Sequence, residues 1–259
     1  MSVDDERGAA WNVSGSGTRP PGPVQDLSMP KTVLTVLFAL TAVVTAASAG
    51  AYANRASVVS DAAGTSPEAD PLASMVAVDA DRLTRADDLV GLGLWGYTVA
   101  ALALAVFFII WQYRHAQNAR LLGSRSALGP GWAIGGWFIP LANLVLPVRQ
   151  LWTASRSSNP GGRGAGIVVA WWAAFVAAIL IDRTAAQLGV DGPRDDLTVG
   201  DLANADWLAA GGEVVFTAAA VLGLIMVRRL TDAQGAALAG RPRDAVPPGP
   251  PVPPPPPAA

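Results

Sequence analysis

The chain has no cysteine and only one histidine, His115, among its 259 residues. Disulfides, zinc–thiolate sites, iron–sulfur clusters and thiol nucleophiles are therefore excluded. A histidine-based metal site or catalytic triad would depend on His115 alone. The zinc-protease helix motif, the phosphate-binding loop and the nucleophile elbow are all missing from the sequence. The sequence thus offers no catalytic residue, no metal site and no cofactor-binding motif.

Charge is also scarce. Only 15% of the residues are charged and 51% are hydrophobic, whereas a soluble domain is about 25% charged. The apolar residues occur in blocks, which predicts one membrane domain with polar ends. The net charge is −2, and the basic residues form no patch dense enough for nucleic acid. We therefore expect membrane lipids, and no nucleic acid, among the partners.

Four apolar runs are long enough, or nearly so, to cross a membrane. A helix needs about 20 residues to span the roughly 30 Å hydrocarbon core. The runs lie at residues 32–53, 89–113, 165–181 and 207–227. They are continuous rather than alternating, which favours helices over a barrel because backbone groups in lipid must bond internally. The sequence predicts an all-α, polytopic transmembrane helical bundle.

The first run has a competing interpretation. Met29-Pro30-Lys31, the apolar run and then Ala47-Ser48-Ala49 resemble a signal peptide with a small-residue cleavage site. However, 28 residues precede Met29 and the run is 22 residues long, which favours an uncleaved membrane anchor. A true start at Met29 would favour the signal peptide instead.

A fifth apolar block, residues 132–147, is broken by a glycine pair, a central Pro140 and Asn143. Proline removes a helix donor and clashes with the preceding turn, so this block cannot form one straight helix. The Asn143 side chain could satisfy a backbone group that the break sets free. We call this block the broken segment.

The arginine distribution indicates how the chain is threaded. The two acidic loops, residues 54–88 and 182–206, hold five basic residues against thirteen acidic ones, and the other thirteen basic residues flank the opposite ends of the spans. Because cytoplasmic loops collect Lys and Arg, both termini are expected in the cytoplasm, with the chain in the cell (cytoplasmic) membrane. The loops on both sides of the broken segment are basic, which favours a re-entrant or interfacial segment over a fifth crossing.

The ends of the chain differ from this membrane domain, which we place at residues 31–230. Residues 1–30 lack a periodic apolar pattern, and residues 231–259 end in a proline run. Both are expected to be disordered. The proline-rich tail would either dock a protein partner with an aromatic-lined groove or stay solvated. From Pro71 the outer loop shows an amphipathic pattern that leads into the second run.

One stretch of the chain carries a distinctive motif. It includes Trp-Gln-Tyr-Arg at residues 111–114, Asn-Ala-Arg at 118–120 and Pro-Gly-Trp at 130–132, and Trp-Phe-Ile-Pro at 137–140 follows. With Asn143, Pro147 and Trp152, the chain resembles an uncharacterised bacterial membrane family, common in actinobacteria and catalogued as domain of unknown function 4328. The resemblance covers roughly residues 30–230. It implies a multi-span membrane domain and brings no known activity, so it assigns no role to any residue.

The motif supplies the candidate structural or functional residues: Trp111, Tyr113, Arg114, Asn118, Arg120, Trp132, Trp137, Pro140, Asn143, Pro147 and Trp152. At the end of the second run, Trp111, Arg114 or His115, and Asn118 are spaced to share a helix face. One interpretation is an interfacial anchor, with the aromatic rings at the headgroups and the arginines on lipid phosphates. In the other, Arg114 and Asn118 turn inward and satisfy free carbonyls of the broken segment.

Two further features bear on function. After Pro147 a helix can restart, and Arg149, Trp152 and Arg156 would then form a face that contacts the membrane surface. Glu213 is the ionisable residue well inside a span and is therefore a candidate intramembrane acid. It would serve as a proton or cation site, form a structural pair with Arg183 or Tyr97, or stay neutral through desolvation.

These observations favour a non-enzymatic membrane scaffold or regulatory protein that meets partners through its termini. The alternative is a small transporter or channel subunit that uses the broken segment and Glu213. Four spans are few for a transporter, so that alternative would require a homo-oligomer. An intramembrane enzyme is a third alternative, for which the sequence offers no supporting motif.

Overall fold

The computed structural model describes residues 23–64, 80–124, 128–158, 165–188 and 199–241. Within these residues, four long helices are apolar enough to cross a membrane. They are α1 (Ser28–Gly64), α3 (Ala80–Leu121), α6 (Ala165–Leu188) and α7 (Val199–Ala239). The described residues contain helices and turns and no strand. The predicted all-α bundle of four spanning helices is confirmed.

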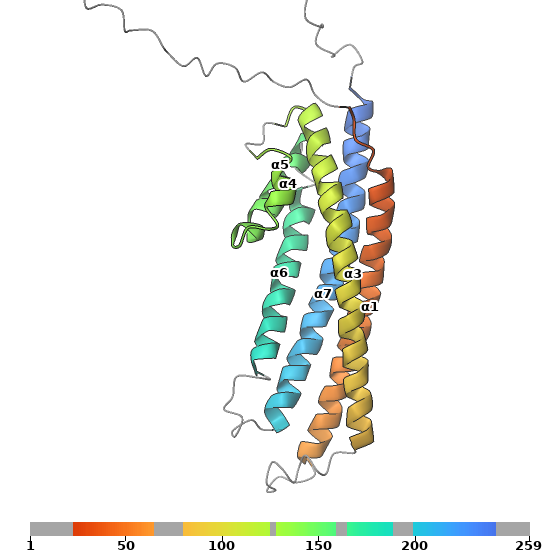
Figure 1. Cartoon of the computed structure of the whole chain (residues 1–259), viewed down its shortest axis with the longest axis vertical. Coiled ribbons are helices and arrows are strands. Elements are labelled where there is room, and N and C mark those ends of the chain that lie inside the picture. Colours follow the sequence, from red (N-terminus) through yellow and green to blue (C-terminus); the bar gives the residue numbers. More distant parts are fainter. Residues whose placement is uncertain (1–22, 65–79, 125–127, 159–164, 189–198, 242–259) are drawn as a thin grey trace, which may run out of the picture.

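The broken segment connects α3 to α6 without crossing the bundle. It consists of α4 (Trp132–Gly135), the 3₁₀ turn η1 (Ala142–Leu144) and the start of α5 (Leu146–Ser158). It leaves one end of the bundle, turns partway along α6 and returns to the same end (Figure 1). The preference for a re-entrant or interfacial segment over a fifth crossing is therefore confirmed.

The two ends of the bundle differ in charge. α1 begins and α7 ends at one end, together with Lys31, Arg114, Arg149 and Arg228, and we call this the basic end (Figure 1). The opposite end collects Asp87, Asp182, Asp201 and Asp206 among other acids, and we call it the acidic end. The charge asymmetry of the sequence is thus an asymmetry of the folded bundle.

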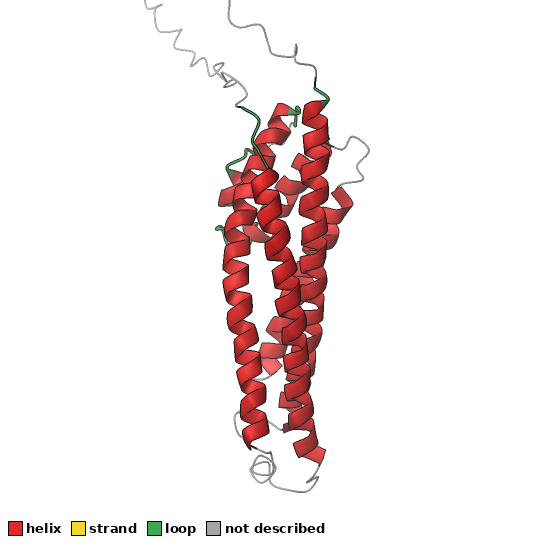
Figure 2. Cartoon of the chain, turned by 90° about the vertical axis from the view of Figure 1, so that its right-hand side faces the viewer, coloured by secondary structure: helices red, strands yellow, loops and turns green. Residues whose placement is uncertain are grey.

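Three of the four helices are much longer than a membrane is thick. α3 has 42 residues, which at 1.5 Å per residue is roughly 63 Å. Residues 54–64, 80–88, 182–188 and 199–206 are helical although we expected loops there, and α7 runs to Ala239, past the expected boundary at residue 230. These extensions lack proline and are rich in alanine, so nothing in their sequence ends the helix. Figure 2 shows the long helices side by side.

Several expectations fall on residues outside this description. Residues 1–22, the amphipathic pattern between Pro71 and residue 79, and the proline run at 242–259 all lie outside the described residues. Residues 23–27 are described and form an irregular segment that leads into α1. Its contacts with α3, described below, place it in the folded domain rather than in a disordered terminus.

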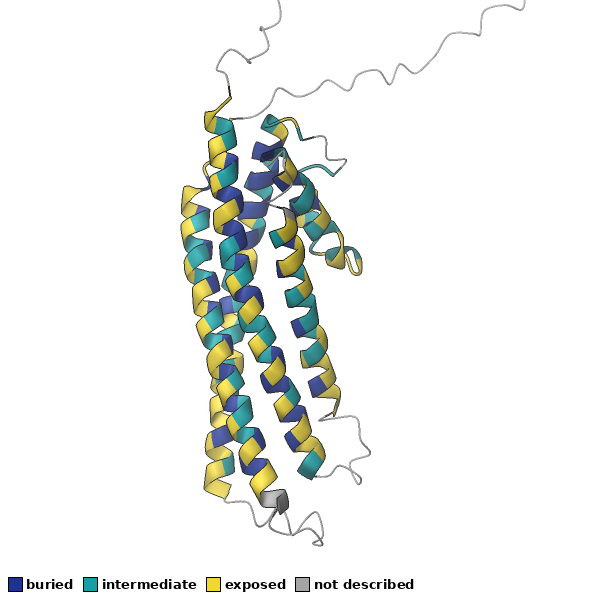
Figure 3. Cartoon of the chain, turned by 180° about the vertical axis from the view of Figure 1, so that it is seen from behind, coloured by how far each residue is buried: buried dark blue, intermediate teal, exposed yellow. Residues whose placement is uncertain are grey.

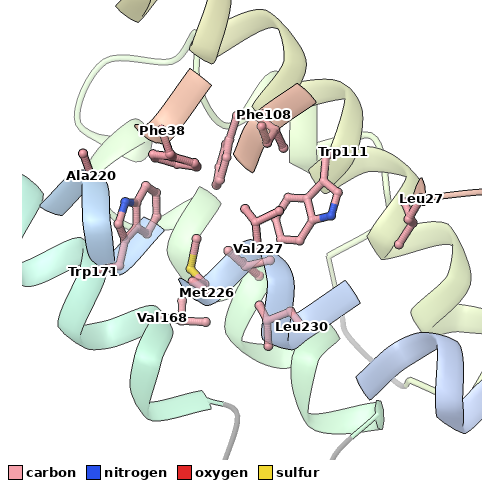
Figure 4. Packing of buried hydrophobic residues seen from close by; sticks show 12 residues of the cluster. Leu27, Phe38, Phe108, Trp111, Val168, Trp171, Ala220, Met226, Val227 and Leu230 are labelled. Atoms are coloured by element: carbon pink, nitrogen blue, oxygen red, sulfur yellow. The ribbon is translucent and has the colours of Figure 1, made fainter. Parts of the chain in front are cut away.

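α1 and α7 pack closely because a glycine meets an aromatic ring. A side-chain carbon added to Gly223 would collide with the ring of Phe38. A similar approach joins α6 and α7, where such a carbon on Gly212 would lie 3.2 Å from Ile181. Buried residues line the faces that the helices turn to one another (Figure 3). The most continuous part of this core lies nearer the basic end, where Phe38, Phe108, Trp111 and Trp171 come together with aliphatic residues of α6 and α7 (Figure 4).

Candidate functional site

Gln112 of α3 fastens the broken segment to the bundle. Its Nε2 donates to the Pro147 carbonyl at 2.9 Å and to Gln150 Oε1 at 3.1 Å. Its Oε1 accepts from the Trp137 indole Nε1 at 3.0 Å. The Gln112 side chain therefore uses both its amide hydrogens and its carbonyl, and it is only 1% exposed. One neutral amide thus bridges the two limbs of the segment, Trp137 before the turn and Pro147 after it.

The hypothesis that Arg114 and Asn118 hold the broken segment is wrong. Successive residues of a helix are rotated by about 100°, so Gln112 faces the broken segment whereas Arg114 and Asn118 face the start of α1. Gln112 was missed although the sequence carried a signal for it: a glutamine lies at the end of an otherwise apolar run, and the next apolar block is broken by proline. A buried amide in such a place needs polar partners.

Asn118 and Arg114 instead hold residues 23–27, which we call the N-terminal strap. Asn118 Oδ1 accepts the Gln25 main-chain N–H at 2.8 Å, and Asn118 Nδ2 donates to the Gln25 carbonyl at 2.8 Å. Arg114 Nη1 donates to the Asp26 carbonyl at 3.1 Å. Leu27 at the end of the strap is buried in the core. The strap is therefore bound through its main chain, as an extended peptide is bound in a groove.

Further contacts tie the strap to its surroundings. Lys31, one turn into α1, forms an ion pair with Asp232 of α7 at 2.5 Å. Asp26 Oδ1 accepts the Ser28 main-chain N–H at 2.8 Å, and this bond lowers the pKa of Asp26, with help from the Ser28 hydroxyl and the charge of Arg114. A cleft of about 670 Å³ lies between the strap, α1, α3 and α7. The strap therefore forms one wall of a cleft at the basic end.

Trp111 and His115 lie inside the bundle rather than at its surface. Trp111 is fully buried, and its Nε1 donates to Thr231 Oγ1 at 3.0 Å. The interpretation of Trp111 as an interfacial ring is therefore wrong, because the residue joins the core beside Phe108. The His115 ring is also fully buried, and neither ring nitrogen has a hydrogen-bond partner among the described residues. Packing against Trp111, at 5.2 Å between ring centroids, sets its position.

The turn of the broken segment is closed by main-chain hydrogen bonds. The Asn143 N–H donates to the Ile139 carbonyl at 3.0 Å, and the Ala142 N–H donates to the Pro140 carbonyl at 2.7 Å. Leu141 has φ of 62°, in the left-handed region. Within the described chain the Asn143 side chain makes no hydrogen bond, so it does not serve the freed backbone as we expected. Main-chain bonds within the turn satisfy part of that backbone instead.

The outer surface of this segment is apolar. Leu141 is 81% exposed and Phe138 is 72% exposed, and Trp132 and Pro140 are also exposed. An apolar surface of this kind suits contact with lipid hydrocarbon. The segment thus turns the partners of Gln112 inward and its exposed apolar residues outward.

The helix after the break restarts as predicted. α5 begins at Leu146, so Pro147 lies in its first turn. Arg149 and Arg156 are exposed and Trp152 is half-buried between them, whereas Leu151 and Ala154 on the opposite face are buried. The predicted basic face with an aromatic residue is present on the outside of α5. Tyr113 is half-buried and Arg120 is exposed on α3.

Glu213 lies on α7, in the half of the bundle nearer the acidic end. It is half-buried, and its Oε2 has no hydrogen-bond partner among the described residues. The described residues show no ion pair between Glu213 and Arg183, so that expected pairing is not found. Tyr97 and Asp182 lie within electrostatic reach of the carboxylate. Glu213 and the broken segment therefore do not share one polar site.

An ion pair that the sequence did not suggest closes the acidic end. Arg55 of α1 donates from Nε to Asp206 Oδ2 at 2.8 Å and from Nη1 to Asp87 Oδ1 at 3.2 Å. Asp206 is 2% exposed. Arg55 thereby joins α1, α3 and α7. No group of three or more histidine or acidic residues in the described part of the chain could hold a metal ion.

The fold and this site define a four-span helical membrane protein whose broken segment is fastened from inside the bundle. The chain belongs to the family described as Domain of unknown function (DUF4328), whose model matches residues 74–232. The match confirms the resemblance found in the sequence. It starts later than the expected residue 30, so α1 precedes it. No curated protein and no solved structure matches the chain.

Proposed function

We propose that the chain is a non-enzymatic scaffold or regulatory protein of the cytoplasmic membrane, with its basic end and both termini in the cytoplasm. The observation that supports this proposal is the pair of hydrogen bonds between the Asn118 side chain and the main chain of Gln25. Both bonds are to main-chain groups of Gln25, and every residue other than proline presents the same two groups. The groove therefore accepts an extended segment without reading the side chain at this position.

The strap gives such a protein a means of regulation. It forms one wall of a cleft whose other walls include Asn118, Thr231 and Gln234. A partner that binds residues 1–22 and draws the strap away would expose the cleft to a second extended segment. The membrane domain would then act as a scaffold whose own N-terminal segment competes with its partner.

The orientation is supported by the placement of charge. Basic residues gather at the end where the strap, α5 and the end of α7 lie, and the positive-inside tendency favours the cytoplasm for that end. Exposed Arg149 and Arg156 on α5 are suited to anionic lipid headgroups. The proline-rich tail at residues 242–259 leaves from the same end and would reach a cytoplasmic partner with an aromatic-lined groove.

Crosslinking and affinity capture from mild-detergent membranes test the proposal. A photoreactive residue at position 235, an exposed glycine that lines the cleft and has room for a side chain, would be placed in the full chain, in Asn118→Ala and in Gln117→Ala. In the parent chain we expect the probe to crosslink to the strap. In Asn118→Ala the strap loses its two main-chain hydrogen bonds, so we expect crosslinks to other proteins instead. Gln117 is a half-buried neighbour with no bond to the strap, so its variant should match the parent chain.

Deleting residues 242–259 tests the tail separately. If the tail docks a partner, capture with the shortened chain should lose that partner while the strap crosslink is unchanged. Partner lists that are empty and identical for the parent chain, Asn118→Ala and the shortened chain would contradict the scaffold proposal.

A transporter or channel subunit remains the second candidate function because polar groups line part of the bundle interior. The Thr45 and Thr217 hydroxyls lie 2.8 Å apart, and the buried Ser48 hydroxyl has no partner among the described residues. With Glu213, they lie toward the acidic end. Ion flux through oligomers in proteoliposomes would test this candidate. Flux that Glu213→Ala leaves unchanged would remove this carboxylate from the mechanism, and the absence of flux in the parent protein would reject the candidate.

A further inference from the structure

A second hollow in the molecule is apolar and lies within the spans. It has a volume of about 270 Å³ and is lined by residues of α1, α3, α6 and α7. Trp137 of the broken segment lines it as well, and so do Tyr97 and Phe216, on the side toward Glu213. It is separate from the cleft under the strap, with which it shares no lining residue. The function proposed above does not use it.

Aromatic rings from several elements form its walls. The centroids of Phe108 and Trp171 are 5.2 Å apart, and those of Phe108 and Trp137 are 6.0 Å apart. Phe175 meets Phe216 at 6.3 Å in an edge-to-face arrangement. Phe38, Phe108 and Trp171 converge in the same part of the core (Figure 4). Such ring contacts hold a wall of fixed shape.

One side of the cavity is not sealed by helix packing. α1 packs against α3 and α7, and α6 packs against α7, whereas α3 and α6 form no comparable interface. Both helices carry exposed apolar residues, including Val99 and Leu102 of α3 and Leu180 of α6. At this depth the surrounding solvent is lipid hydrocarbon. The gap between α3 and α6 therefore connects an apolar cavity with an apolar medium.

We propose that this cavity binds one acyl chain of a bilayer phospholipid, which enters sideways between α3 and α6. Its volume is nearly twice that of an engineered apolar cavity of about 150 Å³, which stays dry and binds benzene. Water would find few polar partners there. Of the four lining side chains that can hydrogen-bond, the Thr41 hydroxyl already donates to the Leu37 carbonyl and the Trp137 indole to Gln112, which leaves Tyr97 and Trp171. The acyl chain is the apolar molecule that surrounds the gap.

Photolabelling with a lipid probe tests this proposal. The full chain would be reconstituted in phosphatidylethanolamine–phosphatidylglycerol vesicles that contain a trace of phosphatidylcholine with a diazirine at the middle of one acyl chain. Adducts would be mapped by mass spectrometry after illumination. We expect adducts on Phe175 and Ala219, which line the cavity. Ala219 is 3% exposed, so bulk lipid outside the bundle cannot reach it.

A matched pair of variants separates the cavity from the outer surface. Ala101 lines the cavity and Ala103, two residues along the same helix, does not. Ala101→Phe should fill the cavity and reduce the Ala219 adduct to background. Leu102 is exposed on the outer surface, so we expect bulk lipid to label it in the parent and in this variant alike. Ala103→Phe should leave both adducts as in the parent protein.

Two results would overturn the proposal. The first is an unlabelled Ala219 in the parent protein. The second is an Ala219 adduct that persists in an Ala101→Phe variant which elutes as a single folded species. If Ala101→Phe fails to fold, the parent map decides, because labelled Ala219 supports the proposal and unlabelled Ala219 contradicts it.

Discussion

At the basic end of the bundle, neutral side-chain amides hold the irregular segments, beside a solvent-exposed Lys31–Asp232 ion pair. At the acidic end, an arginine binds a buried carboxylate. Gln112 and Asn118 hold the broken segment and the strap at one end. Arg55 holds Asp206 and Asp87 at the other. The difference follows from the backbone. Irregular segments carry free N–H and carbonyl groups that must be satisfied, while continuous helices leave only side chains to connect them.

The stability of the two ends should also respond to different perturbations. A neutral amide is indifferent to salt, and the loss of one buried amide leaves several polar groups unpaired. An ion pair near the surface weakens with ionic strength. The basic end should therefore respond most to deletion of single hydrogen-bonding groups, and the acidic end to salt as well.

The largest effect is expected for Gln112→Leu. It leaves the Trp137 indole, the Pro147 carbonyl and the Gln150 side chain without this partner, at about 1–3 kcal/mol for each buried unsatisfied group. Because such costs are not additive, we expect a net destabilisation of about 3 kcal/mol. Thermal unfolding of the detergent-solubilised protein, followed by tryptophan fluorescence, measures it.

Gln117→Leu is the control for that variant, since Gln117 is half-buried on the same helix and makes none of these bonds. It should leave the stability nearly unchanged. Equal stability of Gln112→Leu and Gln117→Leu would show that the broken segment does not depend on Gln112.

A smaller loss of stability is expected for Arg55→Met, which leaves the buried Asp206 carboxylate without its cation. Removing one partner of a fully buried pair costs about 3–5 kcal/mol, but the Arg55 side chain is 23% exposed, which reduces the expected loss to roughly 2 kcal/mol. The difference from the parent should shrink as salt is raised, whereas the effect of Gln112→Leu should not. Arg183→Met, an exposed residue at the same end, is the control. If the loss of stability in Arg55→Met did not change with salt, the proposed difference between the two ends of the bundle would be contradicted.

Asn118→Ala should act locally, with a loss of about 1 kcal/mol in global stability. The strap can detach and solvate its own main chain, so the cost of unpaired groups is avoided. Hydrogen exchange at the Gln25 amide should rise strongly while exchange in α6 stays constant. If Gln25 remains as protected as in the parent, Asn118 does not hold the strap.

The smallest expected effect is the loss, at low pH, of the stabilisation that ionised Asp26 provides. The folded state lowers the pKa of Asp26 below its ordinary value of 3.8, so the unfolded chain takes up this proton first as the pH falls. The stabilising contribution is present above the ordinary value and is lost as the pH drops through the folded value. Exchange protection of the Ser28 amide should therefore decline in acid, and Asp26→Asn should remove that pH dependence.

The broken segment illustrates what sequence reasoning could establish. Its glycine pair and proline predicted a break, and the arginines on both sides predicted a return to the same end, because each rule concerns a local property of the chain. The sequence could not assign the residue that fastens it. Gln112 and Arg114 differ by two positions, and the choice depends on where α3 is rotated relative to α5 and α1, which is a matter of tertiary packing.

The same limit applies to the ends of the helices and to the acidic end. Hydropathy marks where an apolar run ends, not where the helix ends, so each expected span falls within a helix while α3 and α7 continue well beyond it. The Arg55–Asp206 pair joins residues 151 positions apart, and no spacing rule links such residues. Trp111 was assigned to the lipid interface from its position near a span end, but packing placed it in the core.

The central claim is that the chain between α3 and α6 leaves and returns at one end of a four-span bundle. The chain has no cysteine, so single cysteines at Ser124, Ser157 and Arg183 can be labelled with a membrane-impermeant maleimide in sealed vesicles of known orientation. We predict that positions 124 and 157 react from the same side and position 183 from the other. Labelling of 124 and 157 from opposite sides would show a fifth crossing and contradict the account.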